Sequence, residues 1–134
     1  MMKAAALALV TLSAPAIASP DAVTPEVAAA NDWLKQLDAK NWNESWEGTG
    51  NLFQSNLTQE QWAKTAQAVR EPLGAVISRH ILGVTKTTTL PGAPDGEYGV
   101  LTYSTAFRNK ASAVETVVLI HDGEQWKIVG YFIR

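Results

Sequence analysis

The chain has 134 residues, of which 46% are hydrophobic and 18% are charged, and its formal net charge is −2. This length fits one domain, and the composition is typical of a folded protein rather than a disordered one. Cysteine is absent, which excludes a disulfide framework, a thiolate metal site and a cysteine nucleophile. A slightly acidic chain lacks the excess of positive charge that attracts nucleic acid or an anionic membrane, so we expect neither as a partner.

The first 18 residues have the pattern of a secretory signal peptide. Lys3 is followed by an apolar run over residues 4–12, and Ala16-Ile17-Ala18 forms a small-x-small cleavage site. The run is shorter than the roughly 20 residues that a membrane-spanning helix needs. We therefore expect cleavage after Ala18, a single mature domain over residues 19–134 with no membrane span, and a periplasmic or secreted location.

Residues 24–74 carry helical patterning. Thr24-Pro25-Glu26 is typical of a helix start, and the apolar residues that follow it recur at helical spacing: Val27, Ala30, Leu34 and Leu37. A short helix through Trp42 and Trp46, a turn at Gly48–Gly50 and a helical turn near Phe53 are expected next. Thr58-Gln59-Glu60-Gln61 matches a capping box, which predicts a further helix that ends at Pro72-Leu73-Gly74.

The second half of the chain is rich in β-branched and aromatic residues. It predicts four strands, at residues 76–89, 98–107, 113–121 and 126–133, separated by short turns. Asp122-Gly123 is the strongest hairpin signal in the chain. Helices followed by strands indicate an α+β fold, with the N-terminal helices packed on a four-stranded antiparallel meander.

The third and fourth strands are apolar on both faces over much of their length. Val118 and Ile120 alternate with Val117 and Leu119, so neither face is clearly the solvent face. Helices can cover only one face of the sheet. We expect the other face to pack against a second copy of the chain, or the sheet to curl tightly enough to cover itself.

A series of short motifs through most of the mature chain resembles the DUF4019 family of small secreted bacterial proteins. The motifs are Trp33-Leu34, Leu37-Asp38, Trp42, Ser45-Trp46, Gln61-Trp62, residues 70–74, Ser78-Arg79, residues 90–98, residues 107–110, Glu115-Thr116 and residues 126–132. The resemblance implies a fold similar to the NTF2-like, cystatin-like α+β cone, in which helices close a strongly curved sheet around a pocket. It implies no activity and no site residue.

Five tryptophans are present, four of them in the helical half. Trp46 and Trp62 are candidates for an aromatic ligand pocket, because tryptophan offers a large flat face and one N–H donor. The alternative is that the tryptophans fill a core built from short helices, and their helical spacing favours it. The two histidines are isolated and no cysteine is present, so we expect no metal site, and no motif indicates a cofactor.

Arg79 and Glu115 are charged residues on apolar faces of predicted strands, where a charge must be paired or neutralised. Together with Tyr103 and Tyr131 they are candidates for a ligand-binding pocket. A structural Arg–Glu ion pair is the alternative. His80 is a third candidate catalytic residue beside Arg79 and Glu115, although no nucleophile motif accompanies it.

These features predict three kinds of function. The first is a small secreted binding or scaffold module, whose partner is a small molecule or an envelope protein. The second is a pocket enzyme of the isomerase, dehydratase or cyclase type, with Glu115 or His80 as general base and Arg79 or a tyrosine polarising the substrate. The third is a purely structural envelope protein. A cavity of about 300 Å³ or more over the sheet, and the polar groups that line it, would distinguish them.

Overall fold

A computed structural model describes residues 23–134, so the predicted signal peptide and its cleavage site lie outside the described part of the chain. The described elements, in chain order, are α1 (Pro25–Asp38), α2 (Trp42–Glu47), α3 (Asn51–Asn56), α4 (Gln59–Arg70), a 3₁₀ turn (Glu71–Leu73), β1 (Val76–Thr87), β2 (Tyr98–Phe107), β3 (Lys110–Asp122) and β4 (Gln125–Ile133). The predicted α+β fold is confirmed: helices precede a four-stranded antiparallel sheet of order β1-β2-β3-β4.

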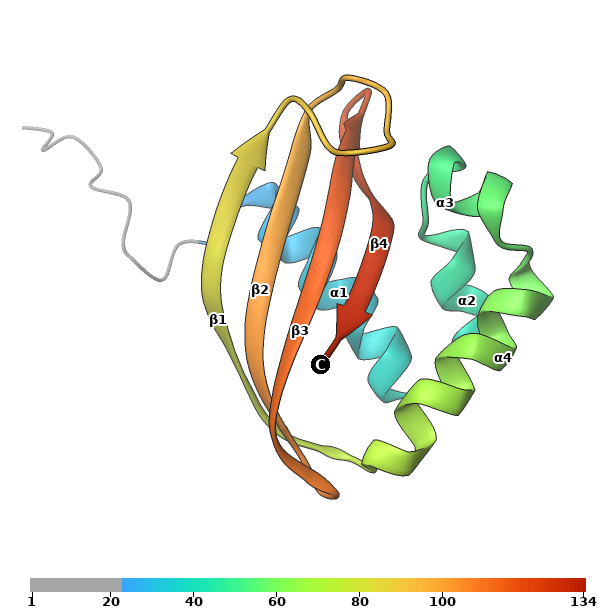
Figure 1. Cartoon of the computed structure of the whole chain (residues 1–134), viewed down its shortest axis with the longest axis vertical. Coiled ribbons are helices and arrows are strands. Elements are labelled where there is room, and N and C mark those ends of the chain that lie inside the picture. The colour runs from blue at the N-terminus through green and yellow to red at the C-terminus, as the bar shows by residue number, and fades with distance from the viewer. Residues whose placement is uncertain (1–22) are drawn as a thin grey trace, which may run out of the picture.

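The helices cover one face of the sheet and one of its edges. Helix α1 crosses the face that we call the inner face, whereas α2, α3 and α4 lie beyond the β4 edge (Figure 1). Residues 48–50 run beside the start of β4, where the Gly50 N–H donates to the Ile128 carbonyl at 2.7 Å. None of the helices in the described range 23–134 is both long and apolar enough to cross a bilayer.

The helix boundaries follow the local signals in the sequence. In α1, Thr24 stands at the N-cap position and Pro25 in the first turn. In α4 the predicted capping box is present: the Thr58 hydroxyl accepts from the Gln61 N–H at 3.1 Å, and the Gln61 side chain accepts from the Thr58 N–H at 3.0 Å. Gly74, at φ 76°, then turns the chain into β1.

Irregular pairing bends the sheet toward the helices. Strand β1 has one extra residue between Val76 and Ser78 and another between Ile81 and Gly83, and β3 and β4 have one each. Extra residues of this kind bend a strand and increase its twist. In β1 the second shift matters for the site, because it places Val84, three residues after Ile81, on the same inner face.

Strand β3 begins at Lys110, three residues earlier than the sequence predicts. Its polar first residues look like a turn, yet Lys110 pairs with Phe107 and the connection shrinks to residues 108 and 109. Backbone hydrogen bonds from this hairpin to Leu73 and Ala75 hold its position. At the other end of β3, the predicted Asp122-Gly123 hairpin is present, with Gly123 at φ 64°.

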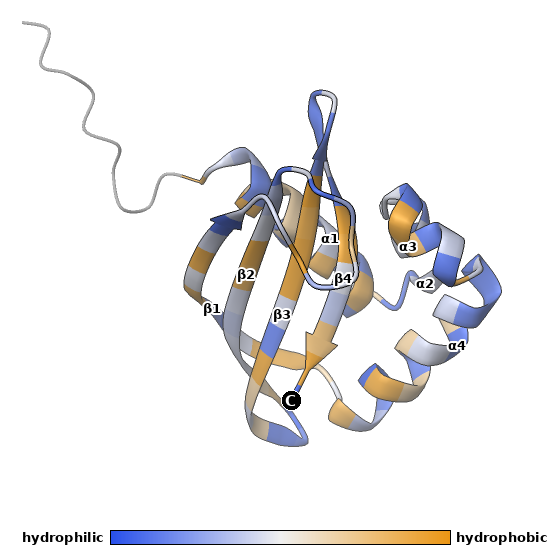
Figure 2. Cartoon of the chain, turned by 45° about the horizontal axis from the view of Figure 1, so that its top comes forward, coloured by the Kyte–Doolittle hydropathy of each residue, from blue (hydrophilic) through white to orange (hydrophobic). Residues whose placement is uncertain are grey.

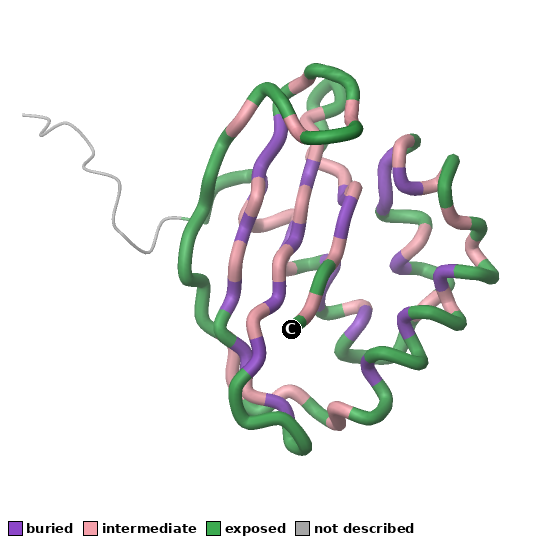
Figure 3. The backbone as a smooth tube through the Cα atoms, in the orientation of Figure 1, coloured by how far each residue is buried: buried purple, intermediate pink, exposed green. Residues whose placement is uncertain are grey.

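The core lies between α1, α4 and the inner face. Apolar residues concentrate on the strands, whereas the hairpin tips are hydrophilic (Figure 2). Strands β2 and β3 alternate between buried and half-buried residues, and β1 is exposed for much of its length (Figure 3). Trp33 and Trp62 belong to the buried core, and the half-buried Trp42, Trp46 and Trp126 pack against it. These positions fit the core interpretation of the tryptophans.

Candidate functional site

A cavity of about 730 Å³ lies between α1 and the inner face of β1 and β2, and we call it the α1–β1 groove. Its apolar wall consists of Val23, Val27, Ile81 and Val84, and its polar wall includes Asn31, Lys35, Asp38, Arg79 and Tyr103. The volume falls within the range of small-molecule sites, about 300–1,000 Å³. Arg79 and Tyr103 are thus the two sequence-predicted site residues that reach this cavity.

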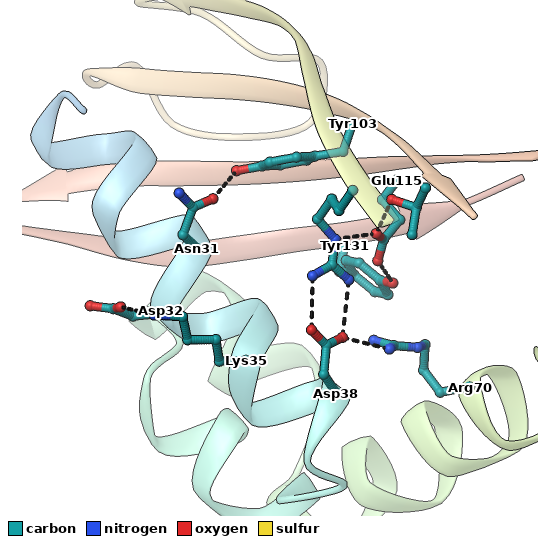
Figure 4. Close-up of polar contacts among 10 residues, drawn as sticks. Asn31, Asp32, Lys35, Asp38, Arg70, Tyr103, Glu115 and Tyr131 are labelled. Carbon is teal, nitrogen blue, oxygen red and sulfur yellow. Dashed lines mark hydrogen bonds and ion pairs between the residues drawn. The ribbon is translucent and has the colours of Figure 1, made fainter. Parts of the chain in front are cut away.

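The polar end of the groove is built around the Arg79 guanidinium, which joins β1 to the end of α1. Two of its nitrogens donate to the Asp38 carboxylate, at 2.8 Å and 3.0 Å, and its Nε donates to Glu115 at 2.8 Å (Figure 4). A guanidinium carries five N–H groups, so two remain beyond these three bonds. Arg79 and Glu115, whose ion pair was one of the alternatives that the sequence left open, are therefore in contact, and Asp38 is a second acidic partner of Arg79.

Glu115 lies behind the groove wall and is fully buried. One carboxylate oxygen accepts from Arg79 and from the Thr105 hydroxyl at 2.6 Å, and the other accepts from the Tyr131 hydroxyl. Three donors satisfy a buried charge that would otherwise be very costly. Glu115 and Tyr131 thus hold the sheet side of the groove in place and are absent from the residues that line it.

Burial and charge shift the proton affinities of this cluster in opposite directions. For Asp38, burial alone would raise the pKa, but hydrogen bonds from Arg79 and Arg70, and their positive charge, lower the pKa below its ordinary value. For Tyr103, burial raises the pKa to about 12, with the Arg79 charge opposing and the Glu115 charge adding to the shift. Near neutral pH the wall therefore presents a carboxylate and a neutral phenol.

Tyr103 bridges the sheet and α1. Its hydroxyl donates to the Asn31 side-chain oxygen at 3.1 Å, and Figure 4 shows the Asn31 amide nitrogen pointing away from this contact. Lys35 lies one helical turn further along α1 and forms an exposed ion pair with Asp32 at 3.7 Å. Asn31 and Lys35 therefore add N–H donors to the helix side of the groove.

Arg70 anchors the same cluster from α4. Its Nη2 donates to Asp38 at 2.7 Å, and its guanidinium carbon lies 5.0 Å from the centre of the Phe107 ring, a cation–π distance. Only 4% of its side chain is exposed. Its Nε and Nη1 have no hydrogen-bond partner among residues 23–134. The Asp38 carboxylate thus accepts hydrogen bonds from two arginines, Arg79 on β1 and Arg70 on α4.

The remaining sequence candidates lie elsewhere. His80 is exposed, because its neighbour Arg79 points to the inner face and His80 to the outer one. Trp62 borders a separate groove of about 570 Å³ between β4, α3, α4 and residues 90–93. Its Nε1 donates to the Ser45 hydroxyl at 2.8 Å, and the Nε1 of Trp46 donates to the Leu57 carbonyl at 2.8 Å. Both indoles therefore brace the helices.

Sequence reasoning missed Asp38, Arg70, Asn31 and Lys35. Two of them carry a signal that could have been used. Asp38 is the last residue of α1, where the helix dipole disfavours a carboxylate unless cations compensate it. Arg70 continues the buried stripe of Trp62 and Ala66 at four-residue spacing, which places a charge on an apolar helix face.

These observations define a small α+β protein in which a helix and a bent antiparallel sheet enclose a partly charged groove. Residues 29–131 match the model of a family described as "Protein of unknown function (DUF4019)". The chain belongs to this family, as the resemblance in its sequence motifs predicts. A comparison with curated proteins gave no match.

Proposed function

We propose that the protein is a small-molecule binding module and that its ligand occupies the α1–β1 groove. The observation that carries this proposal is the groove itself, a cavity of about 730 Å³ with a charged end and an apolar end. Ile81 and Val84, at 45% and 44% exposure, lie on its apolar wall, and none of residues 23–134 covers them fully. A bound ligand would remove this apolar surface from water, which favours binding.

The state of the acidic groups supports binding over proton-transfer catalysis. A general base must have a free lone pair within reach of its substrate. Both Asp38 oxygens accept hydrogen bonds from arginines, and Glu115 is fully buried with three donors on it. His80 lies on the outer face, away from the groove. The alternative, an isomerase-type enzyme, would have to use the one lone pair of Asp38 Oδ2 that no arginine occupies, on a carboxylate whose pKa the two arginines lower.

The test is a screen for ligands by NMR. A chemically diverse fragment library, titrated into the ¹⁵N-labelled protein, should shift the backbone signals of α1 and β1 residues that line the groove. An Ile81→Trp change fills the groove and should abolish these shifts. The matched Leu82→Trp change, at an exposed neighbour outside the groove lining, should preserve them. The proposal fails if no fragment shifts the groove signals, or if the shifts persist in Ile81→Trp.

The fold and setting of this module are part of the proposal. We assign the fold to the NTF2-like, cystatin-like cones; the bulged and bent sheet around α1 supports this assignment. We place the mature protein in the periplasm or outside the cell, on the signal-peptide pattern of residues 1–18. N-terminal sequencing of protein recovered from the periplasmic fraction should begin at Ser19.

We further propose that the outer face of the sheet packs against a second copy. Phe132 is 64% exposed there, and its strand neighbours Thr116 and Val118 are only half buried. An apolar face of several strands is large enough in principle for a stable interface, which hides on the order of 800 Å² per partner. A small-molecule ligand at the inner face and a second copy at the outer face do not compete.

A further inference from the structure

The α1–β1 groove has a direction, because α1 and β1 run antiparallel. Arg79 pairs with Asp38 at the end of α1, and Lys86 pairs with Glu26 at its start, at 3.4 Å. The groove therefore extends along α1, whose 14 residues span about 21 Å at 1.5 Å per residue. A ligand that fills it is elongated rather than compact.

Polarity changes along this direction. Val23, Val27 and Val84 lie toward the start of α1, and Asn31, Lys35 and Arg79 lie toward its end. The apolar side chains there are exposed, 61% for Val23 and 44% for Val84, and together they form one apolar wall of the cavity. One end of the groove thus suits a hydrocarbon chain and the other suits a polar head.

The polar end favours an anionic head group. Lys35 and Arg79 are the cations and Asp38 is the anion among the described residues that line the groove. Their partners Asp32, Arg70 and Glu115 bring the whole cluster to neutrality, so unused N–H donors, rather than net charge, favour an anion here. The Lys35 ammonium contacts Asp32 at 3.7 Å. Both side chains are exposed, so this ion pair is weak and a ligand anion can replace Asp32 as the partner of Lys35. Two N–H groups of Arg79 and the Asn31 amide therefore line the groove as donors that none of the three contacts of Arg79 uses, and the Lys35 ammonium, held only by Asp32, lies on the same wall.

We infer that the groove binds an unbranched amphipathic monocarboxylate, with its carboxylate at Arg79, Asn31 and Lys35 and its hydrocarbon chain along Ile81 and Val84. This inference rests on the proposed function and names the class of ligand that the same groove takes. The carboxylate accepts the free N–H groups at one end, and the chain covers the exposed aliphatic side chains at the other.

The experiment compares three ten-carbon probes that differ only in the head group: decanoate, decan-1-ol and decylamine. Titration calorimetry below the micellar concentration, with NMR shifts to locate the site, measures the affinity of each. Decanoate should bind about tenfold tighter than decan-1-ol, because its head group forms charge-assisted hydrogen bonds. Decylamine should bind weakest, since its charge repels Lys35 and Arg79.

Two pairs of variants separate the ends of the groove. Lys35→Glu should weaken decanoate binding severalfold and leave decan-1-ol unchanged, whereas Lys64→Glu, an exposed lysine on α4, should alter neither. Ile81→Ser should weaken both probes, whereas its matched control Leu82→Ser, outside the groove lining, should weaken neither. Lys35 and Ile81 are 78% (side chain) and 45% (residue) exposed, so these changes leave the buried cluster intact.

The outcomes distinguish the inference from the proposed function. Equal binding of all three probes, or preference for the alcohol or the amine, overturns the carboxylate assignment while the groove remains a binding site. The assignment is also overturned if decanoate shifts the NMR signals of residues outside α1 and β1, or if the Lys35→Glu protein binds decanoate with unchanged affinity. If no ten-carbon probe binds but fragments of other shapes shift the groove signals, the inference is wrong and the proposed function stands.

Discussion

Replacement of Glu115 by glutamine is the sharpest test of the charged cluster. The change keeps the shape of the side chain but removes a charge that Arg79, Thr105 and Tyr131 all donate to. A hydrogen bond to a charged group is worth about 1.5–3 kcal/mol, against about 0.5–1.5 kcal/mol for a neutral one. The amide oxygen can keep the bonds from Arg79 and Thr105 in weakened form, whereas the NH₂ group faces the Tyr131 hydroxyl, which must turn from donor to acceptor. Offset in part by the lower cost of burying a neutral group, these changes give an expected loss of about 2–3 kcal/mol.

Urea unfolding followed by tryptophan fluorescence measures this loss, because Trp33 and Trp62 are buried in the folded chain. Glu97→Gln is the matched control: the Glu97 carboxylate also has a side-chain partner, the His121 Nδ1 at 2.8 Å, but 57% of the Glu97 side chain is exposed. That control should change the free energy of unfolding by less than about 0.5 kcal/mol. Glu115→Ala would leave three buried donors without an acceptor and lower the free energy of unfolding by about 3–5 kcal/mol, enough to unfold a marginally stable domain.

A double-mutant cycle with Thr105→Val identifies the cause of the loss. If the Thr105–Glu115 hydrogen bond contributes, the two changes together should cost less than their sum, with a coupling of about 0.5–3 kcal/mol. A Glu115→Gln protein as stable as the wild type would refute the reasoning. So would a loss no larger than that of Glu97→Gln, since burial would then make no difference.

Three further predictions address the capping box, the buried tyrosine and the outer face. Thr58→Ala should lower the free energy of unfolding by about 1 kcal/mol in the same urea assay, and the exposed Thr65→Ala should not; equal losses would contradict the capping assignment. Burial raises the pKa of Tyr103 to about 12, so its contribution to stability is complete below the unfolded pKa of about 10 and is lost as the pH rises from there to about 12. An ultraviolet titration should show this late phenolate in the folded protein and its absence in Tyr103→Phe; ionisation of all tyrosines near pH 10 would contradict it. Phe132→Glu on the outer face should halve the sedimenting mass at micromolar concentration, whereas Val69→Glu on α4 should not, and a monomeric wild type would exclude the second copy.

The order of elements could be predicted from the sequence because each boundary has a local cause. The capping box at Thr58, the stop at Gly74 and the Asp122-Gly123 hairpin are interactions within a few residues. The start of β3 was placed three residues late for the opposite reason. Its polar first residues are held in the ladder by pairing with Phe107, a partner that a local pattern cannot reveal.

The site was predictable only in part. Arg79 and Glu115 attract attention because strand alternation places charges on apolar faces, yet Asp38, the second acidic partner of Arg79, comes from the other half of the chain, 41 residues from Arg79. The groove depends on the bulge between Ile81 and Gly83, which brings Ile81 and Val84 to one face. Simple alternation from Ile81 would have placed Val84 on the opposite face.

The buried cluster and the groove are physically one arrangement. Asp38 stands at the C-terminal end of α1, where the helix dipole opposes its charge, and only the arginines from β1 and α4 make that position favourable. By clamping Asp38 they fix the distance between α1 and β1, and that distance is the width of the groove. Under the proposed function, Arg79 would serve both stability and binding, so its removal could not separate the two roles. Lys35 and Ile81 are exposed groove residues outside the ion-pair cluster, so changing them tests the proposed binding while the contacts of Asp38 with the two arginines are retained.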